Sequence, residues 1–358
     1  MSSLLIAPEV FAREGGIARI MRSYLLALAE LAPPARLIVL NDNAAAVQRV
    51  PRYLQTHRLT PLVMAGRSKL RFLFACLRHA HKSDHVLCGH LHLAPLLRLI
   101  KLWRPKFCYQ LIAHGIEVWR PYSRLERSAL LHATRILCVS AFTRAEILRR
   151  LPALDADRLV VLPNALDPDF SNPAIAQPAR TITDDVRILS VGRMAGHDAE
   201  KGFDSLILAM PRIRQNHPRA TLRIVGTGAD LPRLQQLAAA QDTADAIRFL
   251  GHISDDELRR EYAHCDVFAL PSRKEGFGLV YLEAMSHGKP CLGANAGGAP
   301  EVINAAVGTL VDYGDQAQIA AAIDDLVGHP REPDRIRRHA DTFAYPAFKQ
   351  RLSALLAA

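Results

Sequence analysis

The sequence predicts an α/β protein made of two doubly wound parallel-sheet domains. A chain of 358 residues is too long for one ordinary hydrophobic core. Short apolar runs alternate with helix-like segments, which is typical of parallel strands joined by helical crossovers. This periodicity weakens near residues 167–183 and then starts again. The 49% hydrophobic and 22% charged residues are typical of a globular protein and exclude a disordered chain.

The first predicted domain spans residues 1–168, and its periodicity gives six strands and several helices. The expected helices include Gly16–Leu31 and Thr143–Arg150. The expected strands are Leu4–Ala7, Arg36–Leu40, Val86–Gly89, Phe107–Ala113, Ile136–Ser140 and Leu159–Leu162.

The second predicted domain spans residues 169–340 and repeats the pattern. The expected strands are Arg187–Val191, Thr221–Val225, Ile247–Leu250, Val267–Leu270 and Pro290–Gly293. The expected helices are Phe203–Asn216, Leu231–Gln241, Asp255–His264 and Leu279–His287. The aromatic tail Phe343–Phe348 then leads into a final amphipathic helix.

The cysteines and acidic pairs argue against a metal or disulfide framework. The six cysteines are scattered without a C-x-x-C pair, which favours a reduced cytosolic protein. Two Asp-x-Asp sequences, at 155–157 and 167–169, lie beside prolines in connecting segments, so we interpret them as turn residues. The amino terminus has no basic region typical of a signal peptide, and no run of about 20 apolar residues predicts a spanning helix.

Positive charge is concentrated in the first third of the chain. Residues 1–120 hold 17 Lys and Arg against 6 Asp and Glu, whereas the whole chain has a net charge of +10. Such asymmetry predicts an anionic partner, either a membrane surface or nucleic acid. The segments Arg67–Arg78 and Leu91–Trp103 resemble basic amphipathic helices that lie on anionic membranes. The alternative is that both simply pack on the sheet. A nucleic-acid-binding protein would carry a recognised module in which aromatic and basic residues are interleaved. The sequence contains no such module.

A glycine-rich turn follows the expected strand Val267–Leu270. In an open α/β sheet, ligands bind at the carboxyl ends of the strands. Here Gly276 and Gly278 flank Phe277, and their small size lets the backbone approach a ligand. The amides at the start of the next helix, at Leu279, can hold a phosphate.

Two glutamates frame this turn. Glu275 precedes the glycines, and Glu283 lies eight residues later, within the helix. A carboxylate at the second position can accept hydrogen bonds from a diol such as a ribose. The alternative is a tight turn with two surface glutamates.

Two cations and a histidine follow other expected strands. Arg193 follows the strand Arg187–Val191, and Lys201 lies on the same loop. Such a pair can neutralise a pyrophosphate leaving group, although a basic loop is more often only solvated. His114 follows Phe107–Ala113, where an isolated histidine is usually a surface or core-edge residue.

These motifs together resemble glycosyltransferase family 4, the retaining transferases with the GT-B fold. The resemblance covers essentially the whole chain. It implies two Rossmann-like doubly wound parallel-sheet domains that face each other across a cleft, with a closing helix, 341–358, that packs back on the first domain. The matching segments are Gly15-Gly16, His114, Val139–Arg144, Leu162–Asp167, Val191–Arg193, Lys201-Gly202, Phe249–Gly251, Pro271–Arg273 and Glu275 with Glu283.

The resemblance also implies roles for the site residues. The catalytic set would be His114, which lies over the transferred sugar, Arg193 and Lys201, which neutralise the diphosphate, and Glu275, which contacts the sugar hydroxyls. Glu283 would bind the ribose. The remaining donor-binding residues would be Gly15, Gly16, Gly276, Phe277, Gly278 and Leu279. The family requires no metal and no cofactor beyond the nucleotide sugar.

A narrower resemblance concerns the segment Ala113–Trp119 and the seven residues between Arg193 and Lys201, more than many members have. Both resemble bacterial exopolysaccharide α-mannosyltransferases, which use GDP-mannose to extend polyprenyl-diphosphate-linked cellobiose. This implies a cytoplasmic enzyme attached peripherally to the inner membrane. The alternatives are a family 4 enzyme of lipopolysaccharide or capsule assembly that uses UDP-glucose or UDP-N-acetylglucosamine, or a nucleotide-sugar epimerase on the same fold.

Overall fold

The computed structural model describes residues 2–12, 15–49, 59–168, 170, 185–194, 196 and 199–357. It divides into two compact units, which are described separately. Unit 1 contains Met1–Asp167 and Tyr345–Ala358, and unit 2 contains Pro168–Ala344. The sequence-based boundary was placed after residue 168, and the closing helix was expected at 341–358.

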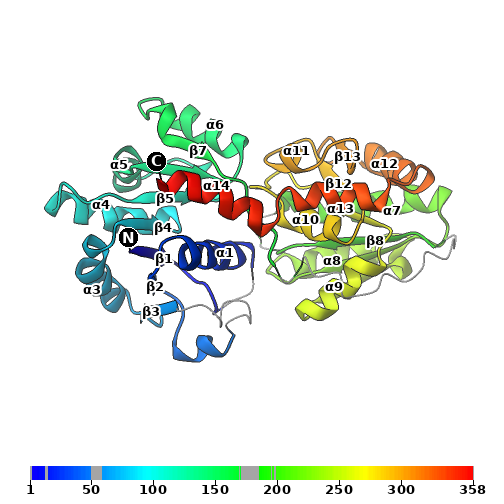
Figure 1. Ribbon diagram of the computed structural model, residues 1–358. Coiled ribbons are helices and arrows are strands. Elements are labelled where there is room, and N and C mark those ends of the chain that lie inside the picture. Colours follow the sequence, from blue (N-terminus) through cyan, green and yellow to red (C-terminus); the bar gives the residue numbers. More distant parts are fainter. Residues whose placement is uncertain are drawn as a thin grey trace. The chain divides into compact units, whose positions relative to one another are not determined.

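The described part of unit 1 contains a seven-stranded parallel sheet with the order β3-β2-β1-β4-β5-β6-β7 (Figure 1). The strand order reverses between β1 and β4, and ligands bind in such sheets beside the carboxyl ends of the strands at this point. The strands are β1 (Ser3–Ala7), β2 (Ala35–Val39), β3 (Leu59–Met64), β4 (His85–Cys88), β5 (Gln110–Ala113), β6 (Arg135–Cys138) and β7 (Leu159–Val161).

Helices connect these strands, and the last helix of the chain also belongs to unit 1. Tyr345 of α14 donates a hydrogen bond to Glu30 of α1 at 2.9 Å, and Phe348 packs edge-on against Tyr24. Figure 1 accordingly shows the red α14 beside the blue α1. The helices are α1 (Gly16–Leu31), α3 (Lys69–His79), α4 (Ala94–Trp103), α5 (Arg124–His132), α6 (Ala141–Arg150) and α14 (Tyr345–Ala357).

The described part of unit 2 contains a six-stranded parallel sheet with the order β10-β9-β8-β11-β12-β13, which reverses between β8 and β11. Its strands are β8 (Arg187–Val191), β9 (Thr221–Val225), β10 (Ile247–Gly251), β11 (Val267–Leu270), β12 (Cys291–Ala294) and β13 (Gly308–Val311). Its helices are α7 (Phe203–Asn216), α8 (Leu231–Ala239), α9 (Asp255–His264), α10 (Leu279–Ser286), α11 (Ala299–Val302), α12 (Gln316–Gly328) and α13 (Pro333–Asp341).

The predicted fold class of two doubly wound parallel sheets is confirmed, with corrections in three strands. The prediction missed the edge strands β3 and β13. Pro61 lies within β3, and Leu310 and Val311 are the only strongly apolar residues of β13. The predicted strand Phe107–Ala113 was too long. Its first described pairing with β4 is at Gln110, because Phe107 instead closes a turn with Arg104 at the end of α4.

Candidate functional site

The loop after β11 is held in one shape by glycines that no other residue could replace without a clash. Gly278 begins α10 with φ 98°, and a Cβ there would lie 2.3 Å from the Tyr281 ring. Gly298 lies against Gly276, where a Cβ would come within 2.4 Å of the Gly276 carbonyl oxygen. Phe277 is buried and packs against Phe343. The backbone amides that open α10 are therefore presented on a rigid loop.

Lys201 and Glu275, which are far apart in the sequence, meet at this loop. Their charged groups form an ion pair at 2.8 Å, and each side chain is only 15% exposed. Gly202 makes this approach possible, because a Cβ at its φ of 78° would lie 2.2 Å from the Pro271 carbonyl oxygen. The structure thus brings together two residues that the sequence predicted to act on one ligand.

Arg193 leaves the carboxyl end of β8, beside β11 in the same sheet. Its side chain is exposed. The backbone before it is tightly packed, since a Cβ on Gly226 would lie 1.9 Å from the Gly192 carbonyl oxygen. Residues 195, 197 and 198 of the following loop lie outside the described residues. Arg193 and the Lys201–Glu275 pair therefore occupy the same edge of this sheet.

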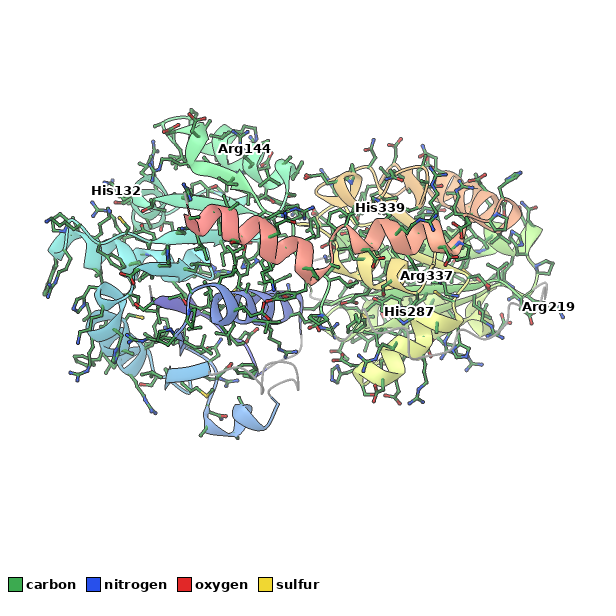
Figure 2. All side chains as sticks on the ribbon, in the orientation of Figure 1. His132, Arg144, Arg219, His287, Arg337 and His339 are labelled. Atoms are coloured by element: carbon green, nitrogen blue, oxygen red, sulfur yellow. The ribbon has the colours of Figure 1, made fainter. Side chains whose placement is uncertain are left out.

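Glu283 is buried, so the interpretation of two surface glutamates is wrong. Its side chain accepts a hydrogen bond from the hydroxyl of Tyr262 at 2.8 Å, and the two residues are 5% and 0% exposed. His287, labelled in Figure 2, lies one turn further along, and burial lowers its pKa. Tyr262 was not predicted, because its position on α9 carries no local signal for a contact with α10.

His114 of unit 1 lies at the carboxyl end of β5 and contacts the end of β4. Its backbone N–H donates to Glu117 at 2.5 Å, and its ring Nε2 lies 2.9 Å from the Gly89 carbonyl oxygen. His90 stacks between His114 and His92, with ring centroids 6.1 and 4.8 Å away. Burial lowers the pKa of His90 to about 3, so this imidazole is neutral at physiological pH.

His90 and His92 were not predicted either. The signal was present, because Gly89-His90 follows the strand β4 directly, as His114 follows β5. Beside them, Arg120 forms an ion pair with Glu126 at 2.5 Å. Hydrogen bonding from this guanidinium lowers the pKa of Glu126 to about 2. The charges of Arg120 and Glu126 therefore neutralise each other.

Gly15 and Gly16 are exposed at the start of α1 in unit 1. A Cβ on Gly15 would meet no atom within 4 Å, so space is open beside it. The buried carboxylate of Asp42 fixes the chain leading to this turn by accepting hydrogen bonds from the backbone N–H groups of residues 10, 11 and 12, at 3.2, 2.8 and 3.1 Å. Asp42 was not predicted; Arg13 and Glu14 lie outside the described residues.

The segment Val139–Arg144 has a structural role in unit 1. Ser140 caps α6 by accepting the backbone N–H of Thr143 at 3.1 Å. Arg144, labelled in Figure 2, donates to the carbonyl oxygens of Ala156 and Leu159, both at 3.1 Å, and so ties α6 to β7.

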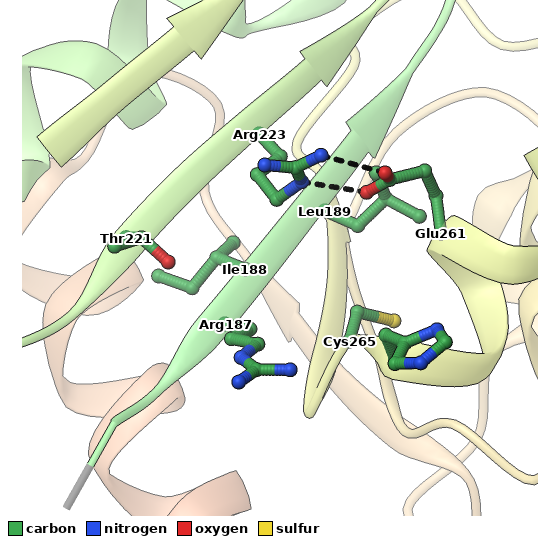
Figure 3. A pocket seen from close by; sticks show the side chains of 8 residues that line it. Arg187, Ile188, Leu189, Thr221, Arg223, Glu261 and Cys265 are labelled. Atoms are coloured by element: carbon green, nitrogen blue, oxygen red, sulfur yellow. Dashed lines mark hydrogen bonds and ion pairs between the residues drawn. The ribbon is translucent and has the colours of Figure 1, made fainter. Parts of the chain in front are cut away.

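A pocket in unit 2 lies beside the amino-terminal ends of its strands. Arg187 and Thr221, which line it, are the first residues of β8 and β9, whereas the predicted site residues follow the carboxyl ends of β8 and β11. Arg223 and Glu261 close one side with two hydrogen bonds of 2.6 Å (Figure 3). This pocket is therefore separate from the candidate site.

Known protein families match both halves of the chain. The model described as Glycosyltransferase Family 4 matches residues 14–170, and the model described as Glycosyl transferases group 1 matches residues 172–343. The chain carries a glycosyltransferase family 4 domain followed by a glycosyltransferase group 1 domain. The residues discussed in unit 1 thus belong to the family 4 domain, and Arg193, Lys201, Glu275 and Glu283 belong to the group 1 domain.

Curated relatives include a mannosyltransferase and a glycogen synthase. The GDP-mannose-dependent alpha-(1-6)-phosphatidylinositol monomannoside mannosyltransferase of Mycolicibacterium smegmatis is 34% identical over 262 residues, which are 66% of this chain and 66% of that relative. The glycogen synthase of Mycobacterium tuberculosis is 29% identical over 286 residues, covering 70% of this chain and 68% of that relative. The chain therefore spans about two thirds of the length of these relatives.

Solved structures establish the fold of the family 4 and group 1 domains as GT-B. Anabaena HepE in complex with UDP and glucose has a TM-score of 0.76 at 18% identity, over 99% of each chain. The sucrose-phosphate synthase of Thermosynechococcus elongatus has a TM-score of 0.77 at 21% identity, over 99% of this chain and 98% of that chain. Within the described residues, no helix has the length and apolar character needed to cross a bilayer.

Proposed function

We propose that this chain is a retaining hexosyltransferase that transfers an α-mannosyl group from GDP-mannose to a polyprenyl-diphosphate-linked oligosaccharide in bacterial exopolysaccharide biosynthesis. The observation that carries the proposal is the partly buried Lys201–Glu275 ion pair beside the glycine-framed start of α10. It supplies a cation for a diphosphate and a carboxylate for sugar hydroxyls at one strand end. The 34% identical mannosyltransferase relative supports the choice of GDP-mannose.

Different residues of the group 1 domain bind different parts of the donor. Lys201 and Arg193 stabilise the diphosphate, while the backbone amides at 276–279 receive its oxygens. Glu275 contacts the hydroxyl groups of the sugar. Glu283 accepts hydrogen bonds from the ribose diol and is positioned by Tyr262. Because Lys201 and Glu275 are already paired, little reorganisation is needed when the donor binds.

Transfer then proceeds on the face of the sugar from which the nucleotide departs. Negative charge grows on the diphosphate as the bond to the sugar breaks, and the cations stabilise this charge. The departing phosphate oxygen takes the proton of the acceptor hydroxyl, which joins the anomeric carbon with retained configuration. His114 and the Gly15-Gly16 turn of the family 4 domain contribute contacts to the sugar and phosphate. The enzyme contributes positioning and charge stabilisation, and we propose that it requires neither a metal nor another cofactor.

A UDP-sugar-dependent transferase of lipopolysaccharide or capsule assembly is the second candidate. The glycogen synthase relative and the HepE structure with UDP and glucose favour a glucosyl donor. A nucleotide-sugar epimerase on the same fold is a further alternative. It would change the donor without an acceptor.

A donor and acceptor screen tests the proposal. The purified protein is incubated with GDP-mannose, UDP-glucose or UDP-N-acetylglucosamine, with and without polyprenyl-diphosphate-linked cellobiose, and nucleotide release and products are measured. We expect GDP release that depends on the acceptor, and an α-mannosylated lipid by NMR. Release of UDP alone would show that the donor is a UDP-sugar and not GDP-mannose. A β-linked product would exclude retention of the anomeric configuration. An epimerised donor in the absence of acceptor would indicate the epimerase.

The proposed acceptor also determines where the enzyme works. A polyprenyl diphosphate is embedded in the membrane, so we propose a cytoplasmic protein attached peripherally to the inner membrane. The anionic membrane surface is then the partner of the basic first third of the chain, and nucleic acid is not.

A further inference from the structure

Two helices of unit 1 carry most of its exposed apolar side chains. Nine large hydrophobic side chains are exposed among the described residues, and six of them lie on α3 and α4. Phe74 is 67% exposed and Trp103 is 84% exposed, values that are unusual for aromatic side chains of a folded domain. The six side chains are Leu70, Phe74, Leu77, Leu99, Leu102 and Trp103.

Each of these helices is apolar on two faces. On α3, Leu70, Phe74 and Leu77 are spaced as i, i+4 and i+7, so they share one face. Other residues of the same helix, including Phe72 and Cys76, are buried in the core. Packing on the sheet therefore explains only the buried face of α3.

The same division holds for α4. Leu97 and Ile100 are buried in the core, whereas Leu99, Leu102 and Trp103 are exposed. The two helices contact each other and lie side by side in unit 1 (Figure 1). Their exposed side chains thus provide the apolar part of a surface that we name the α3–α4 face, defined by the six residues given above.

The segment that carries the α3–α4 face is strongly basic. Residues 59–106 contain nine Lys and Arg but only one acidic residue, Asp84. The Asp84 carboxylate accepts a hydrogen bond from the backbone N–H of Ser2 at 2.6 Å. Exposed cations within this range are Arg67, Lys69, Arg71, Arg78, Lys82, Arg104 and Lys106.

We propose that the α3–α4 face docks unit 1 onto an anionic phospholipid bilayer. Leucine, phenylalanine and tryptophan side chains enter the boundary between headgroups and acyl chains, while the surrounding cations meet anionic headgroups. A second copy of this chain is a poorer occupant, because it would bring an equally basic surface against this one. The proposed function gives the docking its purpose, a lipid-linked acceptor, but the binding itself needs neither donor nor acceptor.

Vesicle flotation tests the proposal on the full chain without substrate. We expect the protein to float with vesicles of phosphatidylcholine and phosphatidylglycerol, and to be released by salt and by omission of the anionic lipid. The Phe74→Ser, Trp103→Ser variant should lose about tenfold or more in affinity. Replacing Arg71 and Arg104 by Gln should cost about fivefold for each cation. Leu125→Ser, at a leucine that is 60% exposed on α5, is the matched control and should bind normally.

Fluorescence gives a second readout at the face itself. The chain has two tryptophans, so in a Trp119→Phe background the emission comes from Trp103 alone. We expect its emission to shift to shorter wavelength with anionic vesicles and to be quenched by brominated lipid.

Three results would overturn the docking proposal. They are wild-type protein that does not float at low salt, equal loss in the Leu125→Ser control, and light scattering that shows a dimer abolished by Phe74→Ser, Trp103→Ser. Lack of flotation with intact mannosyl transfer would reject only the docking face. Normal flotation without donor-dependent nucleotide release would reject only the proposed function.

Discussion

The two sheets reverse their strand order in the same way but carry different chemistry at that point. In unit 2, the end of β11 leads to the partly buried ion pair Lys201–Glu275, and Glu283 lies in the following helix, hydrogen-bonded to Tyr262. In unit 1, the ends of β4 and β5 carry a stack of imidazoles, and exposed glycines follow β1. The same topology thus presents charged groups in one unit and mainly neutral ones in the other.

Topology therefore determines where a site forms, while the side chains determine what it binds. A diphosphate needs cations held in place, and in unit 2 Lys201 is held by its ion pair with Glu275, on the glycine-framed loop after β11. A sugar hydroxyl can also bind neutral donors and acceptors, and burial keeps His90 neutral in unit 1 by lowering its pKa to about 3. The predictions below test whether the two units divide the work in this way.

The largest effect is expected for the charge in unit 2. Lys201→Ala should lower kcat about 10²- to 10³-fold, because loss of one donor to a developing charge costs about 3–4 kcal/mol. Steady-state kinetics with GDP-mannose measures this. Lys274→Ala is the matched control, since Lys274 also pairs with a glutamate at 2.8 Å but its side chain is 46% exposed. A near-normal kcat in Lys201→Ala would contradict the assignment of unit 2 as the half that stabilises the charge of the diphosphate.

The next effect concerns the rigid loop of unit 2. Gly278→Ala should destabilise unit 2 by more than about 2 kcal/mol, because a positive φ costs about 1–2 kcal/mol and the new Cβ also meets the Tyr281 ring. Gly314→Ala is the control, with φ 86° but no atom within 4 Å of its Cβ. Urea unfolding measures both, and equal destabilisation would show that the contact at Gly278 is unimportant.

A smaller effect is expected from the buried hydrogen bond behind Glu283. Tyr262→Phe should weaken GDP binding by about 1–2 kcal/mol, because a buried carboxylate loses a donor. Calorimetric titration with GDP measures this. Tyr109→Phe removes a comparable buried hydrogen bond in unit 1, of 2.7 Å to Ala129, and should lower stability without changing GDP affinity. If both variants bind GDP normally, Tyr262 is only structural.

The smallest effect is the pH dependence that His90 brings to unit 1. In the unfolded chain the His90 imidazole has a pKa near 6.5, whereas in the native protein its pKa is about 3. Stability should therefore fall as the pH drops from 6.5 towards 3, by about 0.7 kcal/mol between pH 7 and 6. Urea midpoints at both pH values should show a shallower fall for His90→Gln than for the wild type. A variant of the exposed His132 (Figure 2), His132→Gln, should behave like the wild type, and an unchanged slope in His90→Gln would contradict the burial.

Local sequence patterns predicted the fold where amphipathic periodicity was strong. The helix Phe203–Asn216 and the strand Thr221–Val225 have the expected bounds. The edge strand β13 was missed because a strand paired on one side needs fewer apolar residues, and β3 was missed because Pro61 interrupts its apolar run. Periodicity reports burial, so it is least informative at the edges of a sheet.

The site was predictable only as far as its residues follow strand ends. Lys201 and Glu275 were found in this way, and the structure brings them together. Tyr262 and Asp42 could not be found, because each acts through a contact with a distant segment that only tertiary packing creates. The burial of Glu283 could not be predicted either, because tertiary packing buries residues 281–285 of α10 on all sides of the helix.

The most direct test of the donor site compares GDP with 2′,3′-dideoxy-GDP by calorimetric titration of wild type, Lys201→Ala and Glu283→Gln. If Lys201 holds the diphosphate, its loss should weaken both ligands equally. If Glu283 holds the ribose diol, Glu283→Gln should weaken GDP but leave the dideoxy ligand unchanged. Equal affinities of all three proteins for GDP would contradict the assignment of unit 2 as the nucleotide-binding half.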